Sequence, residues 1–378
     1  MIITKRSFTI ALGFLSLTGS SAFTIASPKT QSSTSLAASS GLMHCRPIGI
    51  GSAAPDTTIT NFDLEKVVDT TDEWIQTRTG IAQRHVLTST EKLHDLAVIA
   101  GRNALEMAGV KPEELDLVIC ATSSPDDMFG DAPNIANKLG CPTSTVAFDL
   151  TAACSGFLFA SVTAGKFLTS GDKPQRALVL GADALSRWVD WEDRNVCILF
   201  GDGAGAMVLE STPQGDSAAS GLLGYAARSN GAGNVELNCS YLGKPRTVAT
   251  PGEGTVISSA SYNSLFMNGK EVYKFATREV PEVLSEALDA AGMTVDDVDF
   301  LLLHQANIRI METVAKRLGI PMEKVITNLN EYGNTSAASI PLALDAAVRS
   351  GKVKKGDVIA CAGFGAGLSW GAAILRWG

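Results

Sequence analysis

The stretch ALEMAGVKPEELDLVICAT (residues 104–122) recurs later in the chain as ALDAAGMTVDDVDFLLLHQ (residues 287–305). Each copy is typical of a helix end, a glycine stop, an acidic turn and a buried strand. Further along, IANKLGCPTSTVAFDL (135–150) matches VAKRLGIPMEKVITNL (314–329). The two pairs are offset by about 180 residues, which is too long for a solenoid repeat. The sequence therefore predicts two similar α/β halves.

Short apolar strands alternate with helical patterns in both halves. Leu117–Ala121 and Phe300–Leu303 are examples of such strands. This alternation predicts mostly parallel sheets covered by helices. We place the halves at residues 45–215 and 216–378, with 211–220 (STPQGDSAAS) as the connector.

Composition excludes several classes of protein. The chain has 378 residues, 45% of them hydrophobic, and a formal net charge of −8 without any basic stripe, so nucleic-acid binding is not expected. Its seven cysteines show no CxxC spacing and form no ligand-spaced group with the four histidines. We therefore expect reduced thiols and no metal site. No apolar run is long enough to predict a membrane span.

The first residues have the composition of a targeting segment. Residues 1–55 contain no Asp or Glu. A positively charged start, a short apolar run and small residues predict a signal peptide over 1–22. Residues 23–44 are rich in Ser, Thr and Ala, as in a transit peptide, and begin with Phe23. The junction resembles the bipartite presequences of algae with secondary plastids, which implies the plastid stroma. Simple secretion is the alternative.

Three polar residues follow predicted strands. The strand 146–150 runs into a turn with Cys154 and then a helix, whose N-terminus would favour the thiolate. His304 ends the strand of the second copy, and Asn334 follows its next strand, 325–329. Since parallel strands gather ligands at their carboxyl ends, we expect the three side chains to meet. Taken singly, they also fit a buried cysteine, a core histidine and a helix cap.

Two glycine-rich segments, GDGAGAMVLE (201–210) and GFGAGLSWG (363–371), fit neither the phosphate-loop nor the dinucleotide-binding pattern. They predict main-chain turns close to the reactive residues. One of these turns could aim an N–H group at a developing oxyanion.

The motifs TAACSGF (151–157), HQANIRI (304–310) and GNTSAASIPLAL (333–344) resemble those of ketoacyl-acyl-carrier-protein (ACP) synthase III, one of the thiolase-like condensing enzymes. The resemblance covers residues 46–378. It implies a five-layer αβαβα fold of two duplicated halves, and no cofactor. It also implies decarboxylative condensation of an acyl-CoA primer, such as acetyl-CoA, with malonyl-ACP, which starts type II fatty-acid synthesis and gives 3-oxoacyl-ACP, CO₂ and CoA.

The same resemblance implies roles for individual residues. Cys154 would carry the acyl group, and His304 and Asn334 would stabilise the enolate formed as CO₂ leaves. The main-chain N–H groups of Cys154 and Ala366 would form the oxyanion hole. The residues expected to bind CoA or its pantetheine arm are Thr70, Trp74, Arg78, Arg194, Phe200, Met267, Gly269 and Asn307.

The family resemblance extends to partners. Phe129 would close the acyl pocket across a homodimer interface, and Met128 could share that role. An acidic carrier protein would dock on a basic patch made of Lys274, Arg309, Lys316 and Arg317.

Two other functions stay open. One is a related Cys-His-Asn condensing enzyme that takes other CoA starters. The other is a non-catalytic binding subunit of the same fold, against which the intact Cys154, His304 and Asn334 argue. The Cys-His-His pattern of elongating synthases does not fit, because His44, His85 and His94 all precede the cysteine.

Overall fold

The computed structural model describes residues 43–168, 173–212, 221–248 and 254–378. The predicted signal peptide, most of the predicted transit peptide and the predicted junction of the halves at residue 215 lie outside these ranges.

The first sheet has five strands. β4 is parallel to both of its neighbours, whereas β7 is antiparallel to β6 and β1. In spatial order the strands are β1 (Cys45–Ala53), β7 (Asp202–Ser211), β6 (Arg176–Ala184), β4 (Leu117–Ala121) and β5 (Val146–Leu150).

The second sheet repeats this arrangement. In spatial order it contains β8 (Gly221–Ser229), β15 (Ser369–Arg376), β14 (Val358–Gly365) and β13 (Phe300–Leu303). β13 is parallel to β14, while β15 is antiparallel to both of its neighbours. β8, β15, β14 and β13 thus take the places of β1, β7, β6 and β4, as expected for a duplication.

The predicted strand at 325–329 is wrong. Val325 forms a single parallel bridge with Leu301, in the place that β5 occupies in the first sheet. The turn η6 (Met322–Lys324) precedes this bridge, and the helix α8 (Leu329–Tyr332) follows it closely. The turn η6 and the helix α8 together leave too little extended chain for a strand beside β13.

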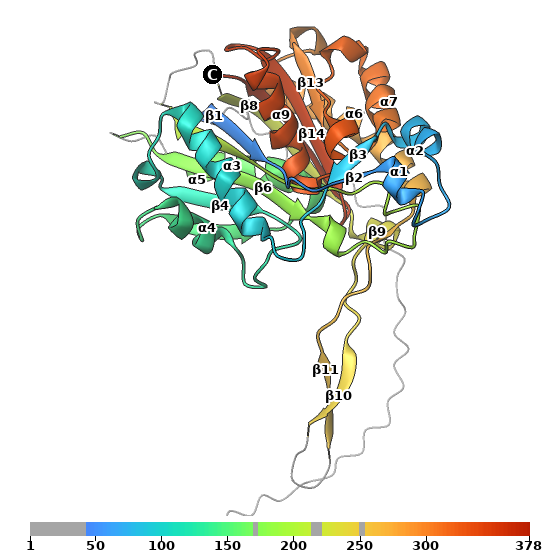
Figure 1. Cartoon of the computed structure of the whole chain (residues 1–378). Helices are drawn as coiled ribbons and strands as arrows, with labels where there is room; N and C mark the ends of the chain where they lie inside the picture. The colour runs from blue at the N-terminus through green and yellow to red at the C-terminus, as the bar shows by residue number, and fades with distance from the viewer. Residues whose placement is uncertain (1–42, 169–172, 213–220, 249–253) are drawn as a thin grey trace, which may run out of the picture. The chain divides into compact units, whose positions relative to one another are not determined.

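Helices form three layers around the two sheets, so the predicted αβαβα architecture is confirmed (Figure 1). The outer layer on the first sheet consists of α3 (Leu93–Ala108) and α4 (Ala132–Leu139). Between the sheets lie α5 (Gly156–Phe167) and α9 (Ser339–Arg349). The long helix α6 (Gly269–Ala291) covers the outer face of the second sheet, with α7 (Ile308–Leu318) packed against it.

β4 shows why the central strands are apolar along their whole length. Leu117, Ile119 and Ala121 contact the cluster between the sheets, whereas Val118 and Cys120 contact the cluster under α3 and α4. Successive side chains of a strand point to opposite faces, and here both faces are covered.

Shorter elements complete the described chain. They are β2 (Thr58–Thr60), α1 (Asn61–Leu64), α2 (Asp72–Thr79), β3 (Gln83–His85), β9 (Leu237–Asn238), β12 (Phe266–Met267), the hairpin of β10 (Lys244–Val248) with β11 (Thr255–Ser259), and the short 3-10 turns η1 (Pro112–Glu114), η2 (Ala153–Ser155), η3 (Leu185–Arg187), η4 (Gly231–Glu236), η5 (Val295–Asp297) and η7 (Ser336–Ala338).

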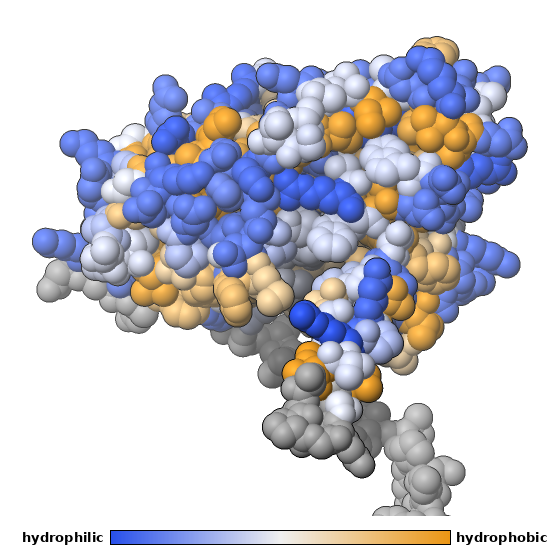
Figure 2. All heavy atoms as spheres, turned by 60° about the horizontal axis from the view of Figure 1, so that its bottom comes forward, coloured by the Kyte–Doolittle hydropathy of each residue, from blue (hydrophilic) through white to orange (hydrophobic). Residues whose placement is uncertain are grey.

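The surface carries both apolar and hydrophilic residues. On the face drawn in Figure 2, apolar patches alternate with hydrophilic ones. Among the residues that the structure describes, none of the helices combines the length and the apolar character needed to cross a bilayer.

Candidate active site

One large cavity, of about 1590 Å³, brings the three predicted residues together. Cys154, His304 and Asn334 all line it. Cys154 lies in η2, directly after β5, and His304 follows the last residue of β13. Asn334 lies just before η7, where it bridges to Phe200. The side chains therefore come from strand ends and turns of both halves, as the repeat predicts.

The turn that holds Cys154 is packed tightly against β14. A Cβ atom on Gly365 would lie 2.9 Å from the main-chain nitrogen of Cys154, so only glycine allows this approach. Ala366, the next residue, also lines the cavity. Two main-chain segments thus lie side by side at the positions that the resemblance assigns to an oxyanion hole.

Burial disfavours the thiolate form of Cys154. Burial raises the pKa of Cys154 to about 12; a hydrogen bond with Ser336 opposes the rise, and the charge of Asp183 adds to it. The sequence predicts that the helix N-terminus favours the thiolate. Burial acts in the opposite direction, because Cys154 is only 7% exposed and a buried thiolate is poorly solvated.

His304 is a buried, neutral imidazole. Its Nδ1 atom lies 2.7 Å from Ser339 Oγ, and its ring meets the edge of Phe364 with centroids 5.3 Å apart. Burial lowers the pKa of His304 to about 3. The ring therefore carries no charge near neutral pH and can act only as a neutral donor or acceptor.

Asn334 is fixed by main-chain hydrogen bonds. Its N–H donates to the Leu199 carbonyl (2.8 Å), and its own carbonyl accepts the N–H of Gly201 (3.0 Å). Its side-chain oxygen accepts the N–H of Ser336 (2.9 Å). The oxygen is therefore engaged, which leaves the NH₂ group as the donor available to a ligand.

The predicted CoA entrance is built around Trp74. The guanidinium carbons of Arg78 and Arg194 lie 4.8 Å and 5.1 Å from the centre of its ring system. Asn307 donates from Nδ2 to the carbonyl of Arg78 (3.0 Å), which ties α2 to the start of α7. This cationic aromatic surface suits an adenine ring and its phosphates.

The other predicted residues divide into two groups. Those that line the cavity are Trp74, Arg78, Phe200, Met267, Gly269, Asn307, Arg309 and Ala366. Those outside its lining are Thr70, Phe129, Arg194, Lys274, Lys316 and Arg317.

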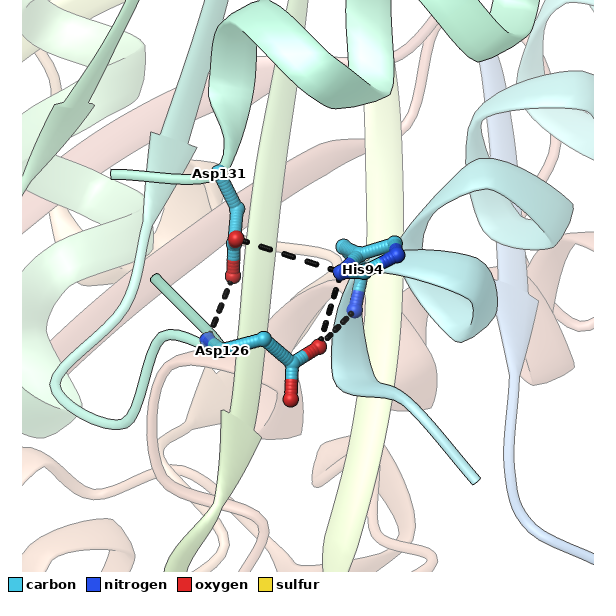
Figure 3. A group of neighbouring side chains, drawn as sticks. All are labelled: His94, Asp126 and Asp131. Carbon is cyan, nitrogen blue, oxygen red and sulfur yellow. Dashed lines mark hydrogen bonds and ion pairs between the residues drawn. The ribbon is translucent and has the colours of Figure 1, made fainter. Parts of the chain in front are cut away.

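Phe129 and Met128 are unusually exposed for large apolar side chains, at 94% and 79%. Met128 lines the cavity, whereas Phe129 does not. The segment that carries them is anchored by His94, Asp126 and Asp131 (Figure 3). His94 Nδ1 lies 2.9 Å from Asp126, and Asp131 accepts the main-chain N–H of Asp126 (2.7 Å).

This group is the one set in the described residues with three metal-ligand side chains close together. Two cations already lie against it: Arg187 binds Asp126 (2.8 Å), and Lys138, which pairs with Asp95 (2.6 Å), lies 2.8 Å from His94 Nε2. Two neighbouring cations disfavour a metal ion. The group instead ties the segment with Met128 and Phe129 to α3.

Sequence reasoning missed three polar residues of the site. Ser336 and Ser339 belong to the GNTSAAS segment (333–339), and their regular spacing beside Asn334 was the available signal. Asp183, near the end of β6, is completely buried, and its carboxylate accepts the main-chain N–H of Ala337 (3.1 Å). Nothing local in its segment GADALS (181–186) indicates that contact.

Comparison with known proteins agrees with this geometry. Family models for 3-oxoacyl-[ACP] synthase III and for its C-terminal part match residues 148–231 and 288–377. The β-ketoacyl-[ACP] synthase III of the cyanobacterium Trichormus variabilis is 55% identical over 330 residues, 87% of this chain and 97% of that protein.

Solved structures extend the likeness. The 3-oxoacyl-[ACP] synthase III of Aquifex aeolicus VF5 is 42% identical, with a TM-score of 0.77 over 88% of this chain and 100% of that one. The priming β-ketosynthase of the R1128 polyketide pathway is 34% identical, with a TM-score of 0.77 over 89% and 97%. Fold and site define a thiolase-like condensing enzyme. The chain belongs to the β-ketoacyl-[ACP] synthase III family.

Proposed function

We propose that this acyltransferase starts type II fatty-acid synthesis by condensing acetyl-CoA with malonyl-ACP, releasing CO₂ and CoA and forming 3-oxoacyl-ACP. The observation that carries the proposal is the convergence of Cys154, His304 and Asn334 on one cavity. A soft nucleophile and two neutral donors are what a thioester exchange followed by a decarboxylation requires.

In the first half-reaction Cys154 takes the acyl group from the CoA thioester. Trp74 and its two arginines hold the nucleotide end, so that the pantetheine arm reaches inward along the cavity. The main-chain N–H groups of Cys154 and Ala366 stabilise the oxyanion of the tetrahedral adduct. An alanine serves here as well as a glycine, because the contact is with the main chain.

In the second half-reaction His304 and Asn334 donate hydrogen bonds to the thioester oxygen of malonyl-ACP. Ser339 Oγ lies within reach of the Gln305 N–H (3.3 Å) as well as of His304 Nδ1. If the serine accepts from Gln305 and donates to Nδ1, the imidazole proton sits on Nε2, as the donor role needs.

The neutrality of His304 matters for the loss of CO₂. An imidazolium would attract the malonyl carboxylate and stabilise the substrate before it decarboxylates. A neutral donor instead interacts most strongly with the enolate oxygen, whose charge grows in the transition state. Burial, which lowers the pKa of His304 to about 3, therefore favours the reaction.

The direct test is a condensation assay with labelled acetyl-CoA and malonyl-ACP. We expect acetoacetyl-ACP from the wild type and none from Cys154→Ala. Asn334→Ala should still acquire the acyl group, but decarboxylate malonyl-ACP about 10²–10³-fold more slowly, as for the loss of one oxyanion donor. Absence of acylation by any CoA thioester would contradict the proposal and leave the binding-subunit hypothesis.

A related condensing enzyme with another starter is the second candidate, favoured by the likeness to the priming ketosynthase of a polyketide pathway. The same assay separates the two candidates when acetyl-CoA is replaced by longer or branched acyl-CoAs. If only those primers acylate Cys154, the proposed mechanism stands and the assigned primer changes from acetyl-CoA to a longer or branched acyl-CoA.

The carrier protein would dock on the predicted basic patch. Arg309 lines the cavity at the start of α7, and Lys316 and Arg317 lie exposed in the last turn of the same helix. The patch therefore leads from the cavity along the surface. Lys274 on α6 pairs with Glu271 (2.7 Å), which weakens its contribution.

Charge reversal tests this docking surface. Lys316→Glu should raise the KM for malonyl-ACP about fivefold, the factor given by ~1 kcal/mol of lost attraction, and leave the KM for acetyl-CoA unchanged. The effect should shrink in high salt. Lys111→Glu, an exposed lysine at the start of η1, is the matched control. Equal effects of both variants would contradict the patch.

We further propose a homodimer that uses the free edge of the first sheet. β5 is the last strand of that sheet, and Val146 on it is 54% exposed. An unpaired apolar edge favours pairing with a second copy. Phe129 would then enter the partner's acyl pocket.

Two measurements test the dimer. Sedimentation should give twice the chain mass, and Phe129→Ala should shift the primer preference toward longer chains. An active monomer would contradict the dimer.

For location we propose the plastid stroma, supported by the acid-free residues 1–55 and by the transit-peptide composition of 23–44. A fluorescent protein fused behind residues 1–44 should enter the plastid of an alga. The same fusion with Phe23→Ala should remain outside the plastid. Secretion of the wild-type fusion would contradict this.

A further inference from the structure

A buried arginine lies behind the loop that carries Asn334. Arg84 is the middle residue of β3, and it is 0% exposed. It lies outside the lining of the cavity, so it does not act on a bound substrate directly. Its place in the site must therefore be sought in the residues that it holds.

The guanidinium of Arg84 binds three uncharged oxygens. Nη1 donates to the Ile59 carbonyl (3.0 Å), and Nη2 donates to Asn61 Oδ1 (3.0 Å) and to the Ile198 carbonyl (2.7 Å). Within the described residues these are its hydrogen-bond acceptors, and none of them is a carboxylate. Burial lowers the pKa of Arg84 to about 10, which leaves the side chain charged at neutral pH.

A buried charge without a carboxylate costs free energy, so the fold must gain something from it. Three oxygens directed at one point repel one another unless a donor with positive charge lies between them. The planar guanidinium supplies several N–H groups in a fixed arrangement, whereas a neutral amide has only two. The charge of Arg84 therefore holds three separate segments of the chain at defined distances from one another.

One of these oxygens belongs to the segment on which Asn334 rests. Ile198 precedes Leu199, whose carbonyl accepts the main-chain N–H of Asn334 (2.8 Å). Two residues further on, the N–H of Gly201 donates to the Asn334 carbonyl (3.0 Å). The hydrogen bond from Arg84 to the Ile198 carbonyl thus fixes the start of the segment that pairs with both main-chain groups of Asn334.

The main chain around Arg84 packs against both partners of that pairing. A Cβ atom on Gly201 would lie 3.1 Å from the Cβ atom of Arg84 and 2.4 Å from the carbonyl oxygen of Tyr332. One on Gly333 would lie 3.3 Å from the same Arg84 atom and 2.8 Å from the carbonyl oxygen of Leu199. Glycine at these two positions therefore lets both segments lie directly against β3.

The opposite side of the guanidinium is anchored by Asn61, which is also 0% exposed. Its Nδ2 atom donates to the Ile81 carbonyl (2.7 Å) and to Asp72 Oδ1 (2.9 Å). Asn61 begins α1 and Asp72 begins α2, so these hydrogen bonds tie the two helices together. The guanidinium is thus held in one place by α1 and α2, and it holds the Ile198 carbonyl in turn.

We propose that Arg84 is a positioning residue for Asn334, an inference that rests on the proposed function. It acts through Ile198 and Leu199, and it keeps the NH₂ group of Asn334 directed at the thioester oxygen of malonyl-ACP. The decarboxylation step needs this donor, whereas the transfer of the acyl group from CoA to Cys154 does not. The loss of Arg84 should therefore slow decarboxylation and spare acylation.

The experiment times the two half-reactions separately in the full chain. CoA release is followed in a single turnover at saturating acetyl-CoA, and CO₂ release is followed after the acylated enzyme is isolated and mixed with malonyl-ACP. Arg84→Met removes the guanidinium but keeps a long side chain. It should slow CO₂ release about 100-fold, the cost of a small displacement of a group at the reacting atoms, and leave CoA release at the wild-type rate.

A double variant shows whether Arg84 acts through Asn334. In the Asn334→Ala background the donor is already absent, so the addition of Arg84→Met should slow CO₂ release no further. A residue that only supports the fold would slow the reaction independently of Asn334. Two effects that multiply in the double variant would therefore overturn the proposal.

Two further variants guard against a simple loss of stability. Arg84→Lys keeps the charge without the planar fork, so it should slow CO₂ release less than Arg84→Met but still more than CoA release, and it decides if the methionine variant does not fold. Arg176→Met is the matched control. It loses ion pairs with Glu114 (2.7 Å) and Glu210 (2.9 Å) outside the cavity lining, and it should lower the melting temperature while both half-reactions keep the wild-type rate.

CO₂ release at the wild-type rate in both Arg84 variants would overturn the positioning role. Equal slowing of CoA release and CO₂ release would also overturn it, because Arg84 would then only stabilise the fold. A wild-type chain that releases no CoA would instead count against the proposed function itself.

Discussion

The site depends on the close approach of two turns, η2 and η7, one from each half of the duplicated fold. Glycine also lets each of these turns lie close to a strand, η7 to β6 and η2 to β14. A Cβ atom on Gly181 would meet the Ala337 carbonyl at 2.3 Å, and one on Gly365 would meet the Cys154 nitrogen at 2.9 Å. Any larger side chain would separate the nucleophile from the residues that surround it.

That packing also sets the chemistry of the side chains. The site is buried, so the thiol holds its proton and the imidazole stays neutral. A neutral His304 suits decarboxylation, because it interacts most strongly with the enolate oxygen. A protonated Cys154 would be slow to react, because the thiolate is the nucleophilic form. One physical cause, exclusion of water, thus favours the decarboxylation step and disfavours the thiolate that the acylation step needs.

Much of this arrangement is predictable from the sequence because it is repeated. The matched segments 104–122 and 287–305 predict β4 and β13 with the bounds that the structure has. The segment 287–305 also places His304 at a strand end, and the segment 135–150 ends in the strand that precedes Cys154. Local pattern fails where tertiary packing decides: residues 325–329 form a bridge and a turn, because η6 and α8 leave too little extended chain. Burial of the thiol and the contact of Asp183 with η7 depend on distant segments and leave no local signal.

The central claim is that Cys154 carries the primer between the two half-reactions. The most direct measurement is peptide mass spectrometry of the chain after reaction with acetyl-CoA, before and after malonyl-ACP is added. The account predicts one acetyl group on the peptide that contains Cys154, and its loss when malonyl-ACP is supplied. An acetyl group on another thiol, such as the cavity-lining Cys239, or one that malonyl-ACP does not discharge, would contradict it.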